Sequence, residues 1–343
     1  MTETALYRKY RPQKFKDVLG QDHIVKVLES SIENGNIAHA YIFAGSRGTG
    51  KTSIARVFAK EVGTSANDIS EIDAASNTGV DDIRSLNESV NTLPFESKYK
   101  VYILDEAHML SKSAWNALLK TLEEPPKHVI FILATTEANK IPETIISRCQ
   151  IFSFKKPTHK VLKNVVLAIS KKEGFSLEAS SADLIALLGD GSFRDAQSVL
   201  QKVMSASKDK KISHEEVETV TGAPKTGLVN DFIRSIDIGD LELGLKTVSV
   251  AIDSNIDTLL YFKLILHKAR SVLLLRNLKS SEEKLQDQMT DTDFKFIKEL
   301  SLNKNSKINS ETLLTLLSYY DMVAKAYIPE LPLELLLTKL IIK

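Results

Sequence analysis

The residues with the clearest chemistry form a glycine-rich loop. Residues 45–52 fit the phosphate-loop pattern G-x-x-x-x-G-K-[ST]. The apolar run 41–44 before them predicts a buried strand, and the spacing of apolar residues in 53–60 predicts a helix. In that order, backbone N–H groups can surround phosphates, Lys51 adds a positive charge and the Thr52 hydroxyl can bind Mg²⁺. A glycine-rich turn that matches by chance is the alternative, and the flanking strand and helix argue against it.

A second apolar run ends in two carboxylates. Residues 100–104 predict a strand that leads directly into Asp105 and Glu106. Asp105 can hold Mg²⁺ or its waters, while Glu106 points to the other side of the strand and can orient or deprotonate an attacking water. Two acids after a strand are common, but downstream of a phosphate-loop lysine they are a strong signal. His108 is open to a catalytic role, although a structural imidazole is the better interpretation.

Three further runs predict the rest of an α/β sheet. Residues 68–73, 129–136 and 150–154 are strand-like, and the second ends in the hydroxyls of Thr135 and Thr136, where open α/β sheets bind their ligands. Arg148, just before the last strand, is explained most simply by a surface salt bridge.

Three segments leave alternatives open. Residues 5–20 carry five basic groups and three aromatics, and they predict either a solvated leader or a flank in which Val18 helps to enclose an adenine. The small polar residues 76–78 open a helix, where they serve either as caps or as phosphate ligands. Arg194 lies in the first turn of a predicted helix, against the preference of the macrodipole, so we expect it to have a phosphate or carboxylate partner.

Composition limits the class of protein. The 343 residues are 43% apolar and 26% charged, as in a soluble globular protein of two or three domains. The net charge of +1 gives no global argument for nucleic acid. The single cysteine, Cys149, excludes an internal disulfide and a cysteine-rich zinc site and fits a reducing cytosol. A polar N-terminus without a signal-peptide core, and charges within the apolar helix at 259–275, predict a cytoplasmic protein with no membrane span.

The region after residues 155–158 predicts only helices. Four form a small bundle, and roughly five longer ones follow Gly222. We therefore predict an α/β domain at 1–158, a small helical domain at 159–222 and a helical domain at 223–343. The broad apolar surfaces of the longer helices suit either the core of one bundle or burial against other subunits.

Taken in order, these motifs resemble the γ/τ subunits of bacterial DNA polymerase III, which are AAA+ ATPases of the replicative clamp loader. The residues that carry the resemblance are Tyr7 to Pro12, Gly45 to Thr52, Glu71 to Ser76, Leu104 to Leu110, Asn116 to Pro126, Ala134 to Thr136, Ser147 to Cys149 and Gly191 to Ala196. The last third agrees only in length and helical character. The resemblance implies an AAA+ domain with a five-stranded parallel sheet, a helical lid and a helical collar for oligomerisation.

The resemblance also implies roles for single residues. Lys51 and Glu106 would be catalytic, Arg148 would be the finger that reaches a neighbour's ATP in trans, and Thr52 and Asp105 would hold Mg²⁺. A sensor of the γ-phosphate would be Thr136 or Thr135, and Arg194 would be the sensor of the lid. The implied nucleotide contacts are Gly45, Ser46, Arg47, Gly48, Thr49, Gly50, Lys51, Thr52, Ser53, Asp105, Thr136, Arg194, Arg11 and Val18. The implied contacts to the DNA backbone are Ser76, Asn77 and Thr78, although the family often has a basic residue there and this chain does not.

The implied function is ATP-driven loading of a sliding clamp onto primer-template DNA. ATP and Mg²⁺ would be the cofactors, and the partners would be δ and δ′ subunits, further copies of this chain, the β clamp and primed DNA. The family usually has a four-cysteine zinc insert before the Glu-Ile-Asp-Ala-Ala-Ser strand. Only Glu61 to Ser70 fill that gap, so we expect no zinc. We also expect that the chain lacks the τ-specific extension.

Two alternatives remain for the function. A non-hydrolysing δ′-type scaffold usually has a degraded phosphate loop, and the intact Lys51 and Thr52 argue against it. A branch-migration or repair helicase of the AAA+ class should end in a winged helix, and the leucine-rich helical end argues against that.

Overall fold

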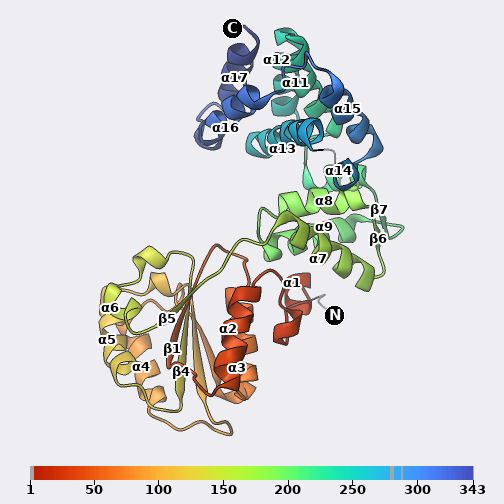
Figure 1. Cartoon of the computed structure of the whole chain (residues 1–343). Coiled ribbons are helices and arrows are strands. Elements are labelled where there is room, and N and C mark those ends of the chain that lie inside the picture. The colour runs from red at the N-terminus through yellow and green to blue at the C-terminus, as the bar shows by residue number, and fades with distance from the viewer. Residues whose placement is uncertain (1–3, 279–281, 287–288, 343) are drawn as a thin grey trace. The chain divides into compact units, whose positions relative to one another are not determined.

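The computed structural model describes residues 4–278, 282–286 and 289–342, and the chain forms two compact units (Figure 1). The first unit extends to Asn164 and includes Gly189–Ser198. The second comprises Val165–Leu188 and Val199–Lys343. The division into three domains at residues 158 and 222 stays a prediction.

A five-stranded parallel sheet forms the centre of the first unit. Its strands are β1 (Ala40–Ala44), β2 (Ile69–Asp73), β3 (Lys100–Asp105), β4 (Val129–Thr135) and β5 (Gln150–Ser153). Their order is β2-β3-β4-β1-β5, and all neighbouring pairs are parallel. The register pairs Ala44 with Thr135 and Asp73 with Asp105, so these four residues lie at the carboxyl edge of the sheet. The predicted five-stranded parallel sheet is confirmed.

Alternate residues of the strands pack into two separate cores, one on each face of the sheet. The first core contains Ile42, Tyr102, Leu104, Phe131 and Leu133 together with apolar residues of helices α4 (Val80–Val90) and α5 (Lys112–Glu123). The second core contains Tyr41, Phe43, Val101, Ile103 and Ile132 together with apolar residues of helices α2 (Asp22–Glu33) and α3 (Lys51–Glu61). Figure 1 shows these two helix pairs on opposite sides of the sheet. Strands buried on both faces explain the nearly continuous apolar runs in the sequence.

The remaining elements of the first unit connect or cover the strands. The helices are α1 (Leu6–Lys9), α2 (Asp22–Glu33), α3 (Lys51–Glu61), α4 (Val80–Val90), α5 (Lys112–Glu123) and α6 (Glu143–Ile146). Short 3₁₀ turns are η1 (Phe15–Asp17), η2 (Ala66–Asp68), η3 (Ala107–Met109) and η4 (Ala138–Lys140). Helix α3 begins two residues earlier than expected, because Gly50 O already accepts the N–H of Ile54 at 2.9 Å. Helix α5 begins after Ser111, whose hydroxyl accepts the N–H of Ala114 at 3.2 Å, as the serine cap predicts.

Helices dominate the second unit. The described ones are α7 (His159–Lys172, whose first turns belong to the first unit), α8 (Ala179–Leu188), α9 (Phe193–Ala206, shared with the first unit), α10 (His214–Thr221), α11 (Thr226–Ile238), α12 (Leu241–Asp253), α13 (Thr258–Asn277), α14 (Glu282–Gln286), α15 (Asp291–Leu302), α16 (Ser310–Lys325) and α17 (Leu331–Ile341). The largest core cluster of this unit is built by helices that follow Gly222, among them α11, α13, α16 and α17. In the described residues, no helix combines the length and apolar character that crossing a membrane requires.

One prediction for this region is wrong. The region is not purely helical, because β6 (Ser176–Leu177) and β7 (Lys211–Ile212) form a two-stranded parallel sheet. Strands of two residues are too short to produce an alternating pattern, which explains why the sequence missed them. Among the described helices after Gly222, six have 11 to 20 residues, which agrees with the roughly five longer helices expected.

Candidate nucleotide-binding site

The phosphate loop joins β1 to α3 at the carboxyl edge of the sheet. Gly48 and Gly50 have positive φ angles of 73° and 100°. A Cβ atom on Gly48 would lie 1.9 Å from the Oγ of Ser192, so only glycine fits there. Within the described chain, the N–H groups of Gly48, Thr49 and Gly50 donate to no protein acceptor. Free N–H groups in a loop before a helix are the donors that a phosphate requires, so the loop fits this group.

Lys51 lies inside this loop. Its Nζ donates to Gly45 O at 2.7 Å and to Ser46 O at 3.0 Å. Burial lowers the pKa of Lys51, and the nearby carboxylates of Glu106 and Asp105 oppose that shift. The ammonium group is therefore buried close to Asp105, the last residue of β3, and to Glu106, the residue after it.

Thr52 and Asp105 are in direct contact. The Thr52 hydroxyl donates to Asp105 Oδ2 at 2.8 Å, while Asp105 Oδ1 accepts the N–H of Glu106 at 3.0 Å. The structure thus brings together the two residues predicted as Mg²⁺ ligands. One hydroxyl and one carboxylate are oxygen ligands of the kind that Mg²⁺ uses beside phosphates, so the pair fits that ion.

Glu106 has an unusual backbone conformation. Its φ of 49° is in the left-handed region, which costs a residue with a side chain about 1–3 kcal/mol. Thr136 Oγ1 donates to Glu106 Oε2 at 3.2 Å. Of the two hydroxyls at the end of β4, the one that contacts Glu106 is therefore that of Thr136.

His108 lies between two acids. Its Nδ1 is 3.6 Å from Glu106 Oε2 and its Nε2 is 3.4 Å from Glu137 Oε1. Nδ1 also lies 3.1 Å from the hydroxyl of Thr135, which is fully buried. The imidazole thus links the end of β4 to the segment that carries Glu106.

The first turn of α9 contacts the phosphate loop directly. Phe193 donates its N–H to Gly48 O at 2.9 Å. The next residue, Arg194, has its guanidinium 5.1 Å from the ring centre of Tyr7, which is a cation–π contact. Arg194 therefore contacts an aromatic ring in this structure, and its expected phosphate or carboxylate partner stays a prediction.

Arg11 and Val18 lie in the N-terminal flank. Arg11 is half-buried and lines a hollow of about 270 Å³ together with Arg56 and Lys60. Burial lowers the pKa of the Arg11 guanidinium, and the charge of Arg56 lowers it further. Val18 packs, partly buried, against the core that contains α2 and α3.

Gln21 is a residue that the sequence did not single out. Its side chain is buried, and its Nε2 donates to Lys155 O at 2.7 Å and to Thr49 O at 3.4 Å. The N–H of Lys155 donates back to Gln21 Oε1 at 3.3 Å. Gln21 therefore ties the phosphate loop to the segment after β5. The only local signal was an amide residue between Gly20 and an amphipathic helix.

The predicted DNA contacts lie in the turn after β2. Ser76 donates through its hydroxyl to Asp73 Oδ2 at 2.9 Å, and Asn77 donates through Nδ2 to Asp73 O at 2.9 Å. The N-terminus of α4 is capped by Asp82, which accepts the N–H of Gly79 at 3.3 Å. Ser76 and Asn77 thus fold back on Asp73 and do not cap α4. Thr78 is exposed nearby, and its carbonyl accepts the N–H of Ser111 at 3.3 Å.

Arg148 follows α6 and is partly exposed. Its Nη2 donates to Glu123 Oε1 at 2.6 Å, and its Nη1 donates to Thr144 O at 2.6 Å and to Ser147 Oγ at 3.1 Å. The salt bridge expected of a surface arginine is therefore present, and its partner is the last residue of α5.

The remaining implied nucleotide contacts lie on or next to the loop. Ser46 and Arg47 are exposed at its tip, and Ser53 is in the first turn of α3. Thr49 is buried, and its hydroxyl donates to Ser46 O at 2.8 Å.

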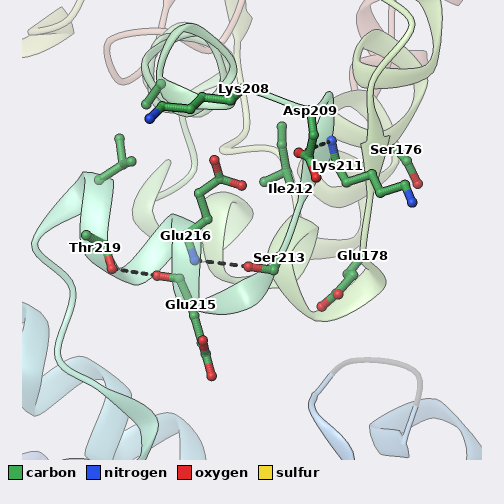
Figure 2. A pocket seen from close by; sticks show the side chains of 12 residues that line it. Ser176, Glu178, Lys208, Asp209, Lys211, Ile212, Ser213, Glu215, Glu216 and Thr219 are labelled. Carbon is green, nitrogen blue, oxygen red and sulfur yellow. Dashed lines mark hydrogen bonds between the residues drawn. The ribbon is translucent and has the colours of Figure 1, made fainter.

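The second unit has a polar hollow of its own, of about 730 Å³ (Figure 2). It is lined by residues of β6, β7, α10 and the segment after α9. Its lining includes four acids and two lysines: Glu178, Lys208, Asp209, Lys211, Glu215 and Glu216. None of the residues predicted to bind nucleotide or DNA lines it.

The fold is similar to that of solved structures. The Thermotoga maritima RuvB Holliday junction branch migration motor has a TM-score of 0.54 and 22% sequence identity. The match covers 66% of this chain and 79% of that one. At this identity the likeness concerns the fold alone.

Sequence comparisons identify nearer relatives. A family model described as DNA polymerase III, delta subunit, matches residues 20–77 and 63–158. The DNA polymerase III subunit tau of Bacillus subtilis (strain 168) is 40% identical over 320 residues, which cover 87% of this chain and 57% of that protein. The corresponding protein of Escherichia coli (strain K12) is 42% identical over 243 residues, which cover 65% of this chain and 38% of that one.

A third relative is the DNA polymerase III subunit gamma/tau of Mycoplasma genitalium (strain ATCC 33530 / DSM 19775 / NCTC 10195 / G37). It is 43% identical over 259 residues, which cover 69% of this chain and 43% of that protein. The chain thus spans about half the length of these curated relatives. Since identities of this size extend over most of the chain, it belongs to the gamma/tau family of DNA polymerase III subunits.

Proposed function

We propose that this chain is the ATP-hydrolysing motor subunit of a clamp loader, which opens a sliding clamp and loads it onto primer-template DNA. The observation that carries the proposal is the contact between Thr52 and Asp105 beside the buried Lys51. Three groups that would serve one MgATP come from two strand ends and meet at one edge of the sheet.

Each side chain of this site has a role in the proposal. Lys51 binds the phosphates together with the free N–H groups of the loop, and Thr52 and Asp105 hold Mg²⁺, which neutralises phosphate charge. Glu106 orients and deprotonates the attacking water, and its bond from Thr136 connects it to the sensor position. Arg194 reaches the phosphates from the first turn of α9. The preceding residue, Phe193, is hydrogen-bonded through its N–H to the phosphate loop.

Other parts of the chain would serve the nucleotide base, the DNA and the ring. Arg11 and Val18 flank the base. Ser76, Asn77 and Thr78 contact the DNA backbone, with Asp73 holding the first two in place. Residues 1–158 form the AAA+ domain, 159–222 the lid and 223–343 the collar that joins subunits.

The partners in this proposal are δ and δ′ subunits, further copies of the chain and the β clamp. Arg148 reaches the ATP of a neighbouring subunit, which makes hydrolysis depend on assembly. The complex acts in the cytoplasm and uses ATP and Mg²⁺ without zinc.

The test is ATP turnover of the complex reconstituted with δ, δ′, the clamp and primed DNA. We expect the clamp and DNA to stimulate turnover, and the Lys51→Ala chain to abolish it. Lys26→Ala removes an exposed lysine of α2 and serves as the matched control, with turnover unchanged. Stimulated turnover that survives Lys51→Ala in every copy would refute the proposal.

A further inference from the structure

We propose that Glu123 positions the Arg148 guanidinium for a neighbour's nucleotide, so that Glu123 influences hydrolysis in trans. This inference rests on the proposed function, in which Arg148 is the finger. Glu123 is a positioning residue here, since it would act through Arg148 and touch no part of the nucleotide.

The Arg148 guanidinium is held from two separate elements. Nη1 donates to the carbonyl of Thr144 at 2.6 Å and to the hydroxyl of Ser147 at 3.1 Å, both within the turn that follows α6. Nη2 donates to Glu123 Oε1 at 2.6 Å, from the C-terminal end of α5. The local contacts alone fix one nitrogen, and the carboxylate fixes the other, so the plane of the group is defined by three acceptors.

The arrangement leaves room for a phosphate. A guanidinium has five N–H donors, and the contacts with Thr144, Ser147 and Glu123 use three of them. Among the described residues, no acceptor contacts the Nε–H or the second Nη2–H. Two donors are what a bidentate contact between arginine and phosphate requires, so Arg148 can bind Glu123 and a phosphate at the same time.

The exposure of the pair indicates what Glu123 contributes. The Arg148 side chain is 33% exposed and that of Glu123 is 49% exposed. In such surroundings the attraction of the two charges adds little to stability. The carboxylate does restrict the rotamers of a long, flexible side chain before the neighbour arrives, which lowers the entropy lost when the finger engages. We therefore expect Glu123 to affect the turnover number and not the binding of nucleotide.

The neighbouring acid offers a matched control. Glu124 has the same side chain, is the next residue and is exposed. Its side chain forms no ion pair in the part of the chain that the structure describes. Glu123→Gln and Glu124→Gln therefore change the net charge equally, and they differ in the contact with Arg148.

The experiment separates the two sides of a subunit junction. Complexes are reconstituted from two forms of the chain with δ, δ′, the clamp and primed DNA. One form carries Lys51→Ala and supplies only a finger, and the other carries Arg148→Ala and supplies only a phosphate loop. Complexes built only from the Arg148→Ala form give the background turnover. Turnover above this background comes from junctions in which the Lys51→Ala form supplies the finger and the Arg148→Ala form supplies the phosphate loop. Glu123→Gln is then added to one form or to the other.

We expect Glu123→Gln to lower this turnover about five- to tenfold in the finger-supplying form, with unchanged Kd for nucleotide. In the form that supplies the phosphate loop, the same substitution should have no effect, and Glu124→Gln should have none in either. Unchanged thermal unfolding of the Glu123→Gln chain confirms that it is folded.

Unchanged or increased turnover with Glu123→Gln in the finger-supplying form would overturn the inference, and an increase would identify Glu123 as a restraint on the finger. Failure of the proposed function looks different. If Arg148→Ala in every copy leaves turnover at the level of the unmodified complex, Arg148 is no finger and the role of Glu123 falls with it.

Discussion

The Thr52 hydroxyl donates a hydrogen bond of 2.8 Å to Asp105 Oδ2 and so joins the first turn of α3 to the end of β3. The other carboxylate oxygen of Asp105 accepts the N–H of Glu106. The Asp105 carboxylate thus contacts both Thr52, which is proposed to bind the metal beside it, and the backbone of Glu106, the proposed catalytic base. A change at Asp105 can therefore be designed to remove the charge and keep one of these two bonds.

Asp105→Asn is that change. The amide oxygen can still accept one of the two hydrogen bonds, but the negative charge that favours Mg²⁺ is lost. We expect the Mg²⁺ concentration that gives half-maximal turnover to rise about tenfold or more. Turnover of the reconstituted complex, measured over a range of Mg²⁺ at fixed ATP, checks this. An unaltered requirement for Mg²⁺ would show that Asp105 is not a metal ligand.

Glu106→Gln should separate nucleotide binding from hydrolysis. Glutamine has nearly the same volume and can still accept the hydrogen bond from Thr136, but it cannot act as a base. We expect nucleotide to bind as it does to the unmodified chain, while turnover falls by about 10²- to 10⁴-fold. Binding of a fluorescent ATP analogue, measured beside turnover, distinguishes the two effects. Equal losses in both would mean that the residue mainly supports the structure of the site.

The sequence was sufficient to predict structural features whose residues all lie in one short segment. The phosphate loop and the strand ending in Asp105 and Glu106 are local patterns, and the sheet around them followed from apolar runs of strand length. Contacts between segments that are distant in the sequence could not be predicted from such local patterns. Gln21 reaches the loop from 28 residues away, and no periodicity indicates it.

The structure of short and irregular segments also could not be predicted from the sequence. Asp68 was expected to begin a strand, but it ends the turn η2, and its carboxylate accepts N–H bonds from Phe95, Glu96 and Ser97. Burial raises the pKa of Asp68, but these bonds outweigh burial and lower it to about 2. The partners of such an acid depend on how a loop closes, which hydrophobic pattern does not encode.

Gly48→Ala tests the close approach of α9 to the phosphate loop. The positive φ of 73° would strain the backbone of an alanine, and the new Cβ would also collide with Ser192. Gly35 has nearly the same φ, 70°, but a Cβ there meets no atom within 4 Å, so Gly35→Ala carries only the backbone strain. We expect Gly48→Ala to be the less stable of the two by about 1–3 kcal/mol. Denaturant unfolding of both variants provides the comparison, and equal losses would contradict the contact with Ser192.

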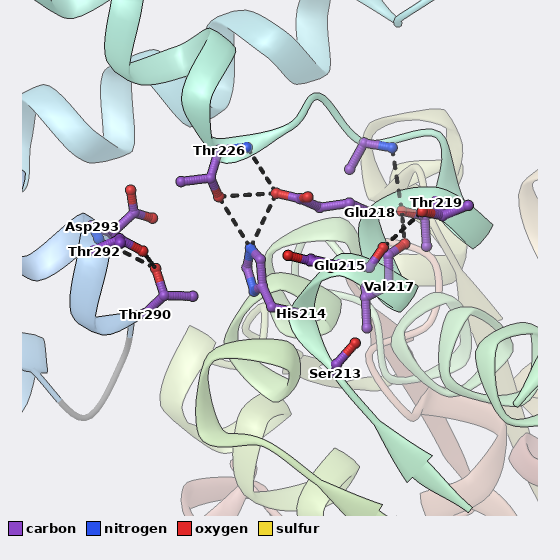
Figure 3. A network of polar contacts seen from close by, with 12 residues as sticks. Ser213, His214, Glu215, Val217, Glu218, Thr219, Thr226, Thr290, Thr292 and Asp293 are labelled. Carbon is purple, nitrogen blue, oxygen red and sulfur yellow. Dashed lines mark hydrogen bonds and ion pairs between the residues drawn. The ribbon is translucent and has the colours of Figure 1, made fainter. Parts of the chain in front are cut away.

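A polar network in the second unit joins α10 to the first turn of α11 (Figure 3). Glu218 Oε1 accepts the N–H of Thr226 at 2.8 Å and its hydroxyl at 2.9 Å. His214 Nε2 lies 3.4 Å from the same carboxylate oxygen. Asp293, on α15, contributes a further negative charge near His214.

Both members of this pair have shifted pKa values. Burial by itself lowers the pKa of His214, but the hydrogen bond and charge of Glu218 outweigh burial and raise it above the ordinary 6.5. Burial raises the pKa of Glu218, but its bonds to His214 and Thr226 outweigh burial and lower it below the ordinary 4.5. The contribution of His214 to the free energy of unfolding is therefore complete below pH 6.5. It is lost as pH rises through the raised pKa of His214. The Glu218 contribution is complete above pH 4.5 and is lost as pH falls through the lowered value.

The pair should consequently stabilise the fold most between about pH 4.5 and 6.5. We expect the thermal unfolding midpoint to decline as pH rises from 6 to 9, and His214→Gln to remove part of that decline. His23→Gln, which replaces an exposed histidine of the first unit, should leave the decline as it is. The thermal unfolding midpoints of the unmodified, His214→Gln and His23→Gln chains, measured at several pH values, test this expectation. If His214→Gln and the unmodified chain showed parallel curves, the network would not be ionised as its contacts imply.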